Sequence, residues 1–345
     1  MVTPLVRLAV TVGDPSGIGP EVLAKALLPP LPCRLVVVGD REVWDDAQRV
    51  STVRVPALPA TRPGLYGPAG VPMREVPVPD RSWGAGAVSA AAGHAAVTWL
   101  EDAVRLALAG EADAVVFAPL NKQAIRLAGY AVRDEYELCA ALAGVTDYDE
   151  VNAIPHPAEP DGALLWVARA TSHVPLRDVA STLTVARVAR AIRRAHAVAR
   201  AAGASVPRIG VAALNPHAGE GGTLGDEEVR IIRPAIEETA ADGIQASGPH
   251  PSDHIFRLAR SGRFDAVVTM YHDQAQIATK LLGFEHGVSV GVGFPFVMTT
   301  PSHGTAFDIV GAGTADPRPM RAALALAVRL ATAGVARRLA DGSPS

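Results

Sequence analysis

The stretch LVRLAVTVGDPSGIGPEVLAKALL, residues 5–28, decides the fold class. It begins with an apolar run, Leu5–Val12, continues through a turn with three glycines, Gly13–Glu21, and ends in the periodicity of a helix, Glu21–Leu28. Pro20 fits this order, because a proline in the first turn of a helix loses no hydrogen bond. Strand, turn and helix in succession are the repeating unit of proteins with a mainly parallel sheet.

The same alternation continues along the chain. Apolar runs predict strands at 34–38, 114–117, 164–168, 208–213 and 266–270, and helical periodicity predicts helices at 85–108, 183–202, 227–242 and 320–339. Residues 51–80 are rich in proline and predict an irregular segment around short strands. We therefore expect an α/β protein, and its length predicts two domains.

Composition excludes several classes of protein. The chain has 345 residues, of which 49% are hydrophobic, and a formal net charge of -3, which argues against a dedicated nucleic-acid binder. No apolar run reaches the roughly 20 residues of a membrane helix. Two cysteines cannot form a disulfide framework, and nothing resembles a signal peptide, so we expect a cytoplasmic protein that acts on a small molecule.

Lysine is rare in this chain. Only Lys25, Lys122 and Lys280 occur, and arginine carries the remaining basic charge. A chain that uses arginine wherever charge alone matters is expected to keep lysine where a compact, titratable ammonium is needed. Lys122 and Lys280 are therefore candidates for a functional site. A GC-rich genome with three lysines left by chance is the alternative, and Lys25, on a predicted helix, fits it well.

Three of the ten histidines directly follow predicted strands, in turns rich in Pro, Gly or Asp: His173 in ATSHVPLRD, His217 in ALNPHAGEGG and His272 in MYHDQ. Ligands bind at the carboxyl ends of strands in open α/β sheets, so these imidazoles can converge on one cation. Three neutral imidazoles with open positions suit a catalytic divalent ion such as Zn, Mg or Co. Each histidine taken alone can also be a hydrogen-bonded turn residue.

Other polar residues accompany these turns. Asp273 is adjacent to His272 and can orient that ligand or bind the metal, and Asp253 in PHPSDHIF is a further catalytic candidate. Either can equally be a helix cap. The first turn lacks the G-x-G-x-x-G spacing of a dinucleotide site, so we assign it to the substrate end of a cleft, with Asp14 facing substrate or capping the helix.

The segment SHGTAFDIVGAGTADP, residues 302–317, resembles the adenosine-binding loop of the isocitrate and isopropylmalate dehydrogenase superfamily. In that loop a His-Gly-Ser/Thr-Ala turn wraps the adenine and ribose of NAD. The resemblance implies cofactor contacts from His303, Gly304, Thr305, Ala306 and Asp316, since small residues let the backbone approach the nucleotide. A glycine-rich loop before a C-terminal helix is the alternative.

Taken in order, SHVPLRD, LNPHAGEGG, YHDQ and HGTAFDI resemble the 4-hydroxythreonine-4-phosphate dehydrogenase family of vitamin B6 synthesis, and the similarity runs nearly end to end. It implies a two-domain isocitrate/isopropylmalate dehydrogenase-like fold with α/β/α layers and a cleft between domains. It also implies NAD as hydride acceptor and a homodimer with the active site at the interface. We expect one domain to comprise 1–128 and 304–345, and the other, with the metal ligands and the dimer interface, 129–303.

The resemblance also assigns individual residues. The family's metal ligands fall on His173, His217 and His272, and its substrate-contacting lysine on Lys280. Lys122 matches the lysine of a Gly-Pro-x-x-Lys turn, although Ala118 stands where Gly is usual. Asn215 and Gly219, in the turn with His217, are assigned to the cofactor.

The sequence departs from the family at the substrate site. Where the family has Gly-His-Thr-Glu, with His and Thr holding the phosphorylated substrate, RDEYE at 133–137 places Glu135 and Tyr136. A substrate-contacting Asn and Arg become Ser289 and Met298. Exchange of His for Glu and of Arg for Met makes the pocket less positive and removes charge-assisted hydrogen bonds to phosphate.

We therefore predict an NAD-dependent and metal-dependent dehydrogenase that oxidises a secondary alcohol of a small unphosphorylated hydroxy acid or diol carboxylate. Decarboxylation follows if the product is a β-keto acid, and Lys122 is the predicted base, directly or through water. One alternative is 4-hydroxythreonine-4-phosphate oxidation, with Arg133 replacing the missing positive charge. Alternatives of other classes are a metal-dependent hydrolase or lyase that uses no nicotinamide and a non-catalytic ligand-binding relative.

Overall fold

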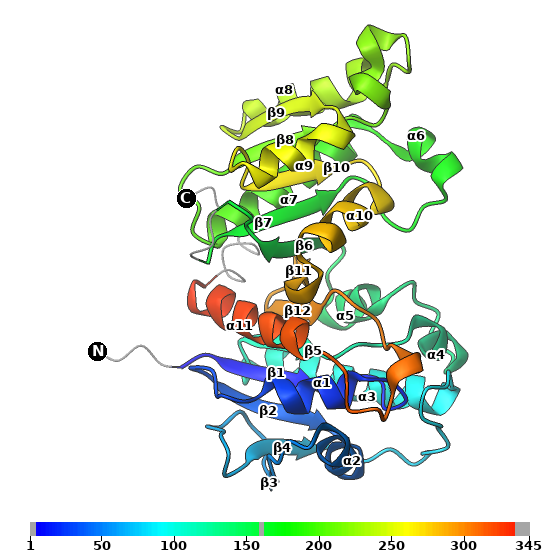
Figure 1. Ribbon diagram of the computed structural model, residues 1–345, viewed down its shortest axis with the longest axis vertical. Helices are drawn as coiled ribbons and strands as arrows, with labels where there is room; N and C mark the ends of the chain where they lie inside the picture. Colours follow the sequence, from blue (N-terminus) through cyan, green and yellow to red (C-terminus); the bar gives the residue numbers. More distant parts are fainter. Residues whose placement is uncertain (1–4, 159–161, 335–345) are drawn as a thin grey trace. The chain divides into compact units, whose positions relative to one another are not determined.

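The computed structural model describes residues 5–158 and 162–334 of the chain. Two compact units can be followed in Figure 1: unit 1 contains the described residues up to Asp149 and from Val288 onward, and unit 2 contains Glu150–Gly287. Their boundaries differ from the expected 128/129 and 303/304, because helix α5 (Glu135–Ala143) and strands β11 (Val288–Val292) and β12 (Val297–Pro301) belong to unit 1.

Unit 1 alternates strands and helices, as its first residues predict. Its other elements are β1 (Arg7–Thr11), α1 (Gly19–Ala26), β2 (Arg34–Gly39), α2 (Arg41–Ser51), β3 (Ala57–Pro59), β4 (Val71–Glu75), α3 (Ala90–Leu108), β5 (Ala114–Phe117), α4 (Lys122–Leu127) and α11 (Arg318–Thr332). The strands follow the order β3-β4-β2-β1-β5-β12-β11. The pairs are parallel except for β11 with β12.

Helices cover both faces of this sheet. The connection from β1 through α1 to β2 crosses the sheet in one direction, and the connection from β4 through α3 to β5 crosses it in the other. Because such crossovers are right-handed, α1 and α3 lie on opposite faces. Helix α1 contacts α2 and α11, whereas α3 contacts α4 and α5. Strands covered on both faces are apolar throughout, which explains runs such as AVVF in β5.

Unit 2 repeats this alternation of strands and helices. Its elements are β6 (Asp149–Pro155), β7 (Leu164–Arg169), α6 (Val179–Thr182), α7 (Val185–Ala201), β8 (Arg208–Ala212), α8 (Arg233–Ala240), β9 (Gln245–His250), α9 (Ser252–Arg260), β10 (Ala266–Thr269) and α10 (His272–Gly283). The order is β6-β7-β10-β8-β9, with only β6 and β7 antiparallel among these neighbours. Side chains of α9 and α10, including Ile255 and Ala275, pack into one core with β7 and β10.

Helix ends differ from the predicted ones for local reasons. Helix α3 begins after Ser89, and α7 begins after Thr184, because these side chains accept hydrogen bonds from the first turn. The predicted helix 227–242 is divided into a wide turn, Glu228–Ile232, and α8, since Pro234 has no N–H for the helical ladder. Residues 335–339 of the last predicted helix lie outside the described residues. No helix among 5–158 and 162–334 has the length and apolarity needed to cross a membrane.

Candidate active site

The three predicted metal ligands of unit 2 follow neighbouring strands. His173 comes after β7, His272 after β10 and His217 after β8, and β10 lies between the other two strands. Because these three strands are parallel, their carboxyl ends lie at one edge of the sheet. Ligands of open α/β sheets bind at this edge, so the topology agrees with the predicted position of the site.

His173 and His272 lie close together. Their ring centroids are 5.6 Å apart, and the backbone of His173 has a left-handed φ of 53°. Nδ1 of His272 is 2.6 Å from Oδ1 of Asp273, the neighbour that the sequence predicts as an orienting group. A carboxylate on one ring nitrogen leaves the other nitrogen as the ligand atom and fixes the ring. This pair of imidazoles therefore suits a divalent ion.

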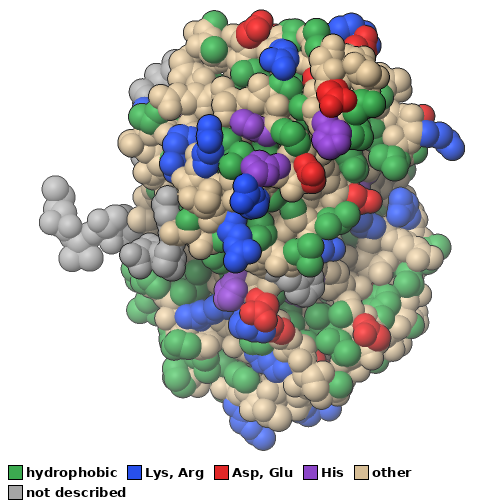
Figure 2. All heavy atoms as spheres, turned by 45° about the horizontal axis from the view of Figure 1, so that its top comes forward, with side chains coloured by type: hydrophobic (Ala, Val, Ile, Leu, Met, Phe, Trp, Pro, Cys, Tyr) green, Lys and Arg blue, Asp and Glu red, His purple; other side chains and the backbone are tan. Residues whose placement is uncertain are grey.

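His217 does not join this pair. Its side chain is exposed, and Figure 2 shows histidine side chains at the surface of the molecule. It begins a run of five residues, 217–221, that all have φ between 45° and 73°. Left-handed backbone costs non-glycine residues about 1–2 kcal/mol each, and such strain concentrates at functional sites. Within the described part of the chain, no group of three or more His, Cys, Asp or Glu side chains could hold a metal ion.

The side chain of Glu228 stabilises the turn that carries His217. This buried carboxylate accepts hydrogen bonds from the backbone N–H groups of Leu214 and Asn215 and from the Asn215 side chain. A Cβ on Gly219 would lie 2.8 Å from the Gly225 carbonyl oxygen, and Gly219 has a φ of 73°, so the position favours glycine. Asn215 and Gly219, expected at the cofactor, therefore shape the His217 turn in this structure.

Two further predicted residues of unit 2 lie on exposed helix surfaces. Asp253 is exposed in the first turn of α9, and Lys280 is exposed in the last turn of α10. Ile277 and Leu281, also in α10, are 64% and 82% exposed. Both lie on the helix that begins with His272.

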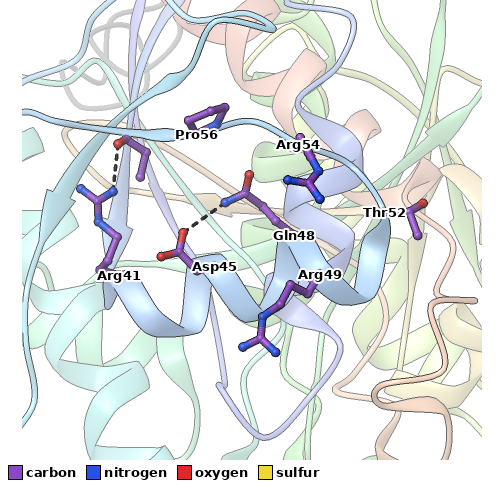
Figure 3. A pocket seen from close by; sticks show the side chains of 8 residues that line it. Arg41, Asp45, Gln48, Arg49, Thr52, Arg54 and Pro56 are labelled. Carbon is purple, nitrogen blue, oxygen red and sulfur yellow. Dashed lines mark hydrogen bonds between the residues drawn. The ribbon is translucent and has the colours of Figure 1, made fainter.

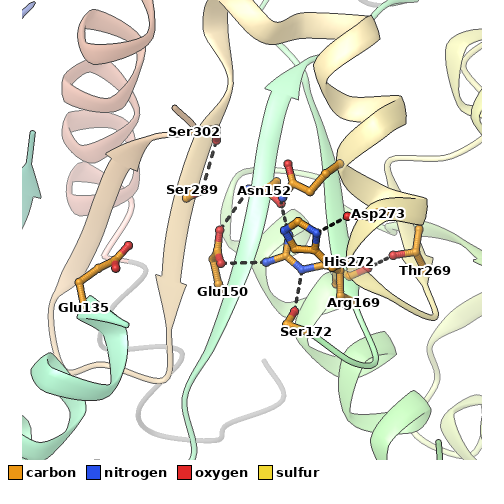
Figure 4. Close-up of polar contacts among 12 residues, drawn as sticks. Glu135, Glu150, Asn152, Arg169, Ser172, Thr269, His272, Asp273, Ser289 and Ser302 are labelled. Carbon is orange, nitrogen blue, oxygen red and sulfur yellow. Dashed lines mark hydrogen bonds and ion pairs between the residues drawn. The ribbon is translucent and has the colours of Figure 1, made fainter. Parts of the chain in front are cut away.

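Sequence analysis missed a buried arginine beside the histidines. Figure 4 shows Arg169, at the end of β7, with its guanidinium hydrogen-bonded to Asn152 Oδ1 and Ser172 Oγ and 2.9 Å from Glu150 Oε2. Asn152 Oδ1 also accepts from Gln276 of α10. This network links the segment before His173 to the helix that carries His272. A charged residue that closes the apolar strand LLWVAR is the signal that could have pointed to it.

In unit 1, three loops come together at the carboxyl ends of β1, β5 and β12, which are also adjacent and parallel. The N–H of Asp14 donates to the carbonyl of Pro119, and the N–H of Ile18 donates to the carbonyl of Thr305. A Cβ on Gly17 would lie 2.8 Å from Thr305 Cβ, so this glycine lets the first and third loops touch. These loops carry Asp14, Lys122 and His303.

Asp14 is a buried carboxyl group in the first of these loops. Its Oδ1 accepts the Ser16 N–H at 2.8 Å, and its Oδ2 is buried with no hydrogen-bond partner among the described residues. Burial disfavours the charged form and raises the pKa of Asp14 to about 6, although the Ser16 N–H opposes the shift. Asp14 therefore forms a turn within its own loop and keeps one oxygen available.

The Asp14 pKa predicts how stability varies with pH. The folded protein binds the proton more tightly than the unfolded chain, whose aspartates titrate near pH 4. The free energy of unfolding should therefore fall by up to about 3 kcal/mol between pH 4 and pH 7 from this group. Asp14→Asn should remove that slope. Urea denaturation of both proteins at pH 5 and pH 7.5 measures it, and an equal difference between the two proteins at both pH values would contradict the assignment.

Lys122 and Glu135 form an ion pair in unit 1. Lys122 Nζ lies 3.7 Å from Glu135 Oε2, and each residue begins a helix, α4 and α5 respectively. The Glu135 side chain is buried, whereas Lys122 is partly exposed. A carboxylate beside the predicted base agrees with the less positive site that the sequence predicts.

Tyr136 and Met298, predicted at the substrate, belong to the core in this structure. Both are buried, and both pack around Gly291 of β11, where a Cβ would lie 2.5 Å from Met298 Cε and 3.1 Å from Tyr136 Cε1. The ring of Tyr136 also packs edge-on against Phe117. Ser289 is buried as well, with its Oγ 3.2 Å from Ser302 Oγ.

The predicted nucleotide loop keeps one imidazole nitrogen available. His303 Nδ1 lies 3.0 Å from the Gly304 carbonyl, and Nε2 is buried without a hydrogen-bond partner among the described residues. Burial lowers the pKa of His303, which keeps the ring neutral. Gly304 is exposed, with open space where a Cβ would lie, and Ala306 has a left-handed φ of 42°. A loop with small residues and one unused polar nitrogen fits a nucleotide.

Asp316, the last residue assigned to NAD, hydrogen-bonds to the nearby Arg318. Its carboxylate accepts the backbone N–H of Arg318 and pairs with that guanidinium at 2.7 Å, at the start of α11. It therefore accepts the N–H of the first residue of α11, whereas the N-cap position of that helix is Pro317.

A separate pocket of about 560 Å³ lies beside α2 (Figure 3). Its lining comes from α2 and the segment that follows it: Arg41, Asp45, Gln48, Arg49, Thr52, Arg54, Pro56 and Ala57. None of the predicted site residues lines it. Gln48 and Arg41 already hydrogen-bond to Asp45 and to the Ala57 carbonyl.

A family model described as pyridoxal phosphate biosynthetic protein PdxA matches residues 32–327. The chain belongs to the PdxA family.

Individual PdxA-type proteins are similar over nearly their whole length. The D-threonate 4-phosphate dehydrogenase of Salmonella typhimurium is 39% identical, over 94% of this chain and 98% of its own. The solved 4-hydroxythreonine-4-phosphate dehydrogenase of Klebsiella pneumoniae is 38% identical, with a TM-score of 0.81 and coverage of 94% and 99%. A solved terephthalate 1,2-cis-dihydrodiol dehydrogenase of Burkholderia xenovorans LB400 is 29% identical, with a TM-score of 0.61 and coverage of 94% and 98%. The predicted family and the isocitrate/isopropylmalate dehydrogenase-like fold are confirmed.

Proposed function

We propose that this PdxA-family chain is an NAD-dependent and metal-dependent dehydrogenase that oxidises a secondary alcohol of a small 4-phosphorylated hydroxy acid or hydroxy amino acid. The supporting observation is the end-to-end similarity to proteins named for D-threonate 4-phosphate and 4-hydroxythreonine 4-phosphate. These relatives favour the phosphorylated alternative over the unphosphorylated substrate that the sequence departures suggest. Similarity to dehydrogenases also disfavours a hydrolase, a lyase or a non-catalytic binding protein.

The metal site of this proposal needs two copies of the chain. His173 and His272 of one chain fit a divalent ion, whereas His217 lies outside their group. We assign the third ligand to His217 of a second copy, and the exposed Ile277 and Leu281 on the helix that begins with His272 support a covering chain. A divalent ion, when bound, polarises the substrate hydroxyl and lowers its pKa.

The chain's own groups supply the remaining steps. Lys122, partly exposed at the start of α4, takes up the hydroxyl proton directly or through a water molecule. His303, neutral and with Nε2 unused, would hold the adenosine half of NAD, which would supply a hydride acceptor for the substrate. Lys280 contacts the anionic part of the substrate. Asp273 holds the His272 ring in its ligating orientation.

One observation favours a second substrate class. Glu135 places a buried carboxylate next to Lys122, and the neutral Met298 is buried where the family has a substrate-binding arginine. A site with less positive charge suits an unphosphorylated diol carboxylate, and one relative is named for a cis-dihydrodiol. This substrate is the second candidate.

Absorbance of reduced nicotinamide tests the proposal. D-threonate 4-phosphate and 4-hydroxythreonine 4-phosphate are supplied beside their unphosphorylated counterparts and a cis-diol carboxylate, with and without a chelator. We expect kcat/KM for a phosphorylated substrate to exceed that of its counterpart by at least about 100-fold, and to vanish with chelator. The reverse preference would establish the second candidate. Failure to reduce NAD with any of these alcohols would overturn both.

A further inference from the structure

Lys25 has the most complete set of hydrogen bonds among the three lysines, although the sequence assigns it no role. It lies in α1, and its Nζ donates to Glu21 Oε1 at 2.7 Å, to the Gly313 carbonyl at 2.8 Å and to the Ala315 carbonyl at 3.0 Å. An ammonium has three N–H donors, so each donor of Lys25 has an acceptor. Chance survival in a GC-rich gene does not explain this arrangement.

Glu21 completes a connection between α1 and the loop 302–317. Its Oε1 also accepts the backbone N–H of Ala315 at 3.0 Å. The side chains of Lys25 and Glu21 are only 15% and 5% exposed. One buried ion pair thus binds two carbonyls and one amide of residues 313–315. We call this pair the Glu21–Lys25 clamp.

The bound segment has no regular structure of its own. Residues 310–317 form neither helix nor strand, and Gly311 and Gly313 have left-handed φ values of 78° and 70°. A Cβ on Gly313 would lie 2.8 Å from the Val50 carbonyl, so the chain passes close to the end of α2. Without helical or strand hydrogen bonds, the backbone of 313–315 depends on side chains for its conformation.

We propose that the Glu21–Lys25 clamp is a positioning element that holds residues 313–315 ready for the adenosine half of the cofactor. The proposal rests on the proposed function in one respect, namely that NAD is the ligand of this loop. A loop that is ordered before binding loses little conformational entropy when the nucleotide binds. The clamp touches none of the groups assigned to proton or hydride transfer, so it should act on cofactor affinity and not on the chemical step.

The geometry also explains why lysine stands here in an arginine-rich chain. Three acceptors converge on one nitrogen atom, which an ammonium satisfies and a planar guanidinium does not. Arginine at position 25 should therefore fail to replace lysine, although it keeps the charge. This distinguishes the clamp from an ordinary surface ion pair.

The test uses the full-length protein with Lys25→Met, Lys25→Arg and Glu21→Gln. Arg105→Met is the matched control, because Arg105 pairs with Glu101 at the same spacing on α3 and does not touch the loop. NAD affinity is measured by calorimetry, and amide hydrogen exchange of 311–315 is measured without NAD. Both Lys25 variants should bind NAD on the order of tenfold more weakly and exchange faster there, with kcat at saturating NAD within about twofold. The control should match the unaltered protein.

Unchanged affinity and unchanged exchange in folded Lys25→Met, or full function of Lys25→Arg, would overturn the proposal. If Lys25→Met does not fold, the Glu21→Gln variant tests the clamp instead. Glutamine keeps an oxygen that can accept from the Ala315 amide but removes the charge of the ion pair. Exchange at 313–315 in this variant should rise, and an unchanged rate would count against the clamp. If the unaltered chain binds no NAD, the proposed function fails, and exchange of these amides alone then decides whether the clamp holds the loop.

Discussion

Replacing His272 with alanine is expected to remove bound metal and turnover together. The His272 ring centroid lies 5.6 Å from that of His173, and Asp273 orients the His272 ring. Loss of the His272 ring leaves His173 as the remaining imidazole of this pair. We expect kcat/KM to fall on the order of 10³-fold or more, because the ion no longer polarises the substrate hydroxyl. Metal content by elemental analysis and NAD reduction measure the two effects.

His286→Ala is the matched control, since this exposed histidine belongs to the same unit and is not assigned to the site. Full turnover in a metal-free His272→Ala protein would contradict the metal-dependent function.

Mixing two inactive variant proteins tests whether the metal site is shared between two chains. His217→Ala and His272→Ala should each be inactive alone. If His217 serves the His173–His272 pair of the other chain, random mixing should restore about a quarter of the normal activity, because about half of the dimers are mixed and each has one intact site. If all ligands came from one chain, every site in the mixture would lack a ligand, and no activity would return.

Replacing Lys122 with methionine should give the second large effect. Methionine keeps most of the length of the side chain and removes the nitrogen that we assign as proton acceptor. A positioned acid or base contributes about 10²–10⁴-fold to rate, so kcat should fall by that factor while metal content and NAD affinity stay unchanged. Single-turnover measurements at saturating substrate check this.

Lys280→Met provides the contrast for this prediction. Lys280 is assigned to substrate contact, and its loss should raise KM more than it lowers kcat. A Lys122→Met protein within a few-fold of normal kcat would exclude Lys122 as the base.

The sequence was informative where chemistry follows from position along a strand. His173, His217 and His272 were predicted from polar turns after apolar runs, and the structure places their strands side by side. It was uninformative about which side chains meet across the sheet. Whether Met298 faces core or substrate depends on its register with Val115 and Gly291 in neighbouring strands, and no periodicity in its own segment contains that information.

Buried polar groups were the second kind of feature that the sequence did not predict. Arg169 and Lys25 read as ordinary basic residues, because charged side chains are normally expected in solvent. Each also has partners that are distant in the sequence, Asn152 for Arg169 and Gly313 for Lys25, and these cannot be predicted from the local sequence. Such networks become visible only when the tertiary structure supplies every acceptor.

The packing of Tyr136 and Met298 around Gly291 limits which substitutions these two positions can accept. Introducing arginine at 298 alone would press a charge between an aromatic ring and a strand that has no room for it, so this substitution should destabilise the protein before any substrate benefits. Substitutions at 136 and 298 should therefore be epistatic, and evolution in the laboratory toward the usual family specificity should succeed only through paired mutations.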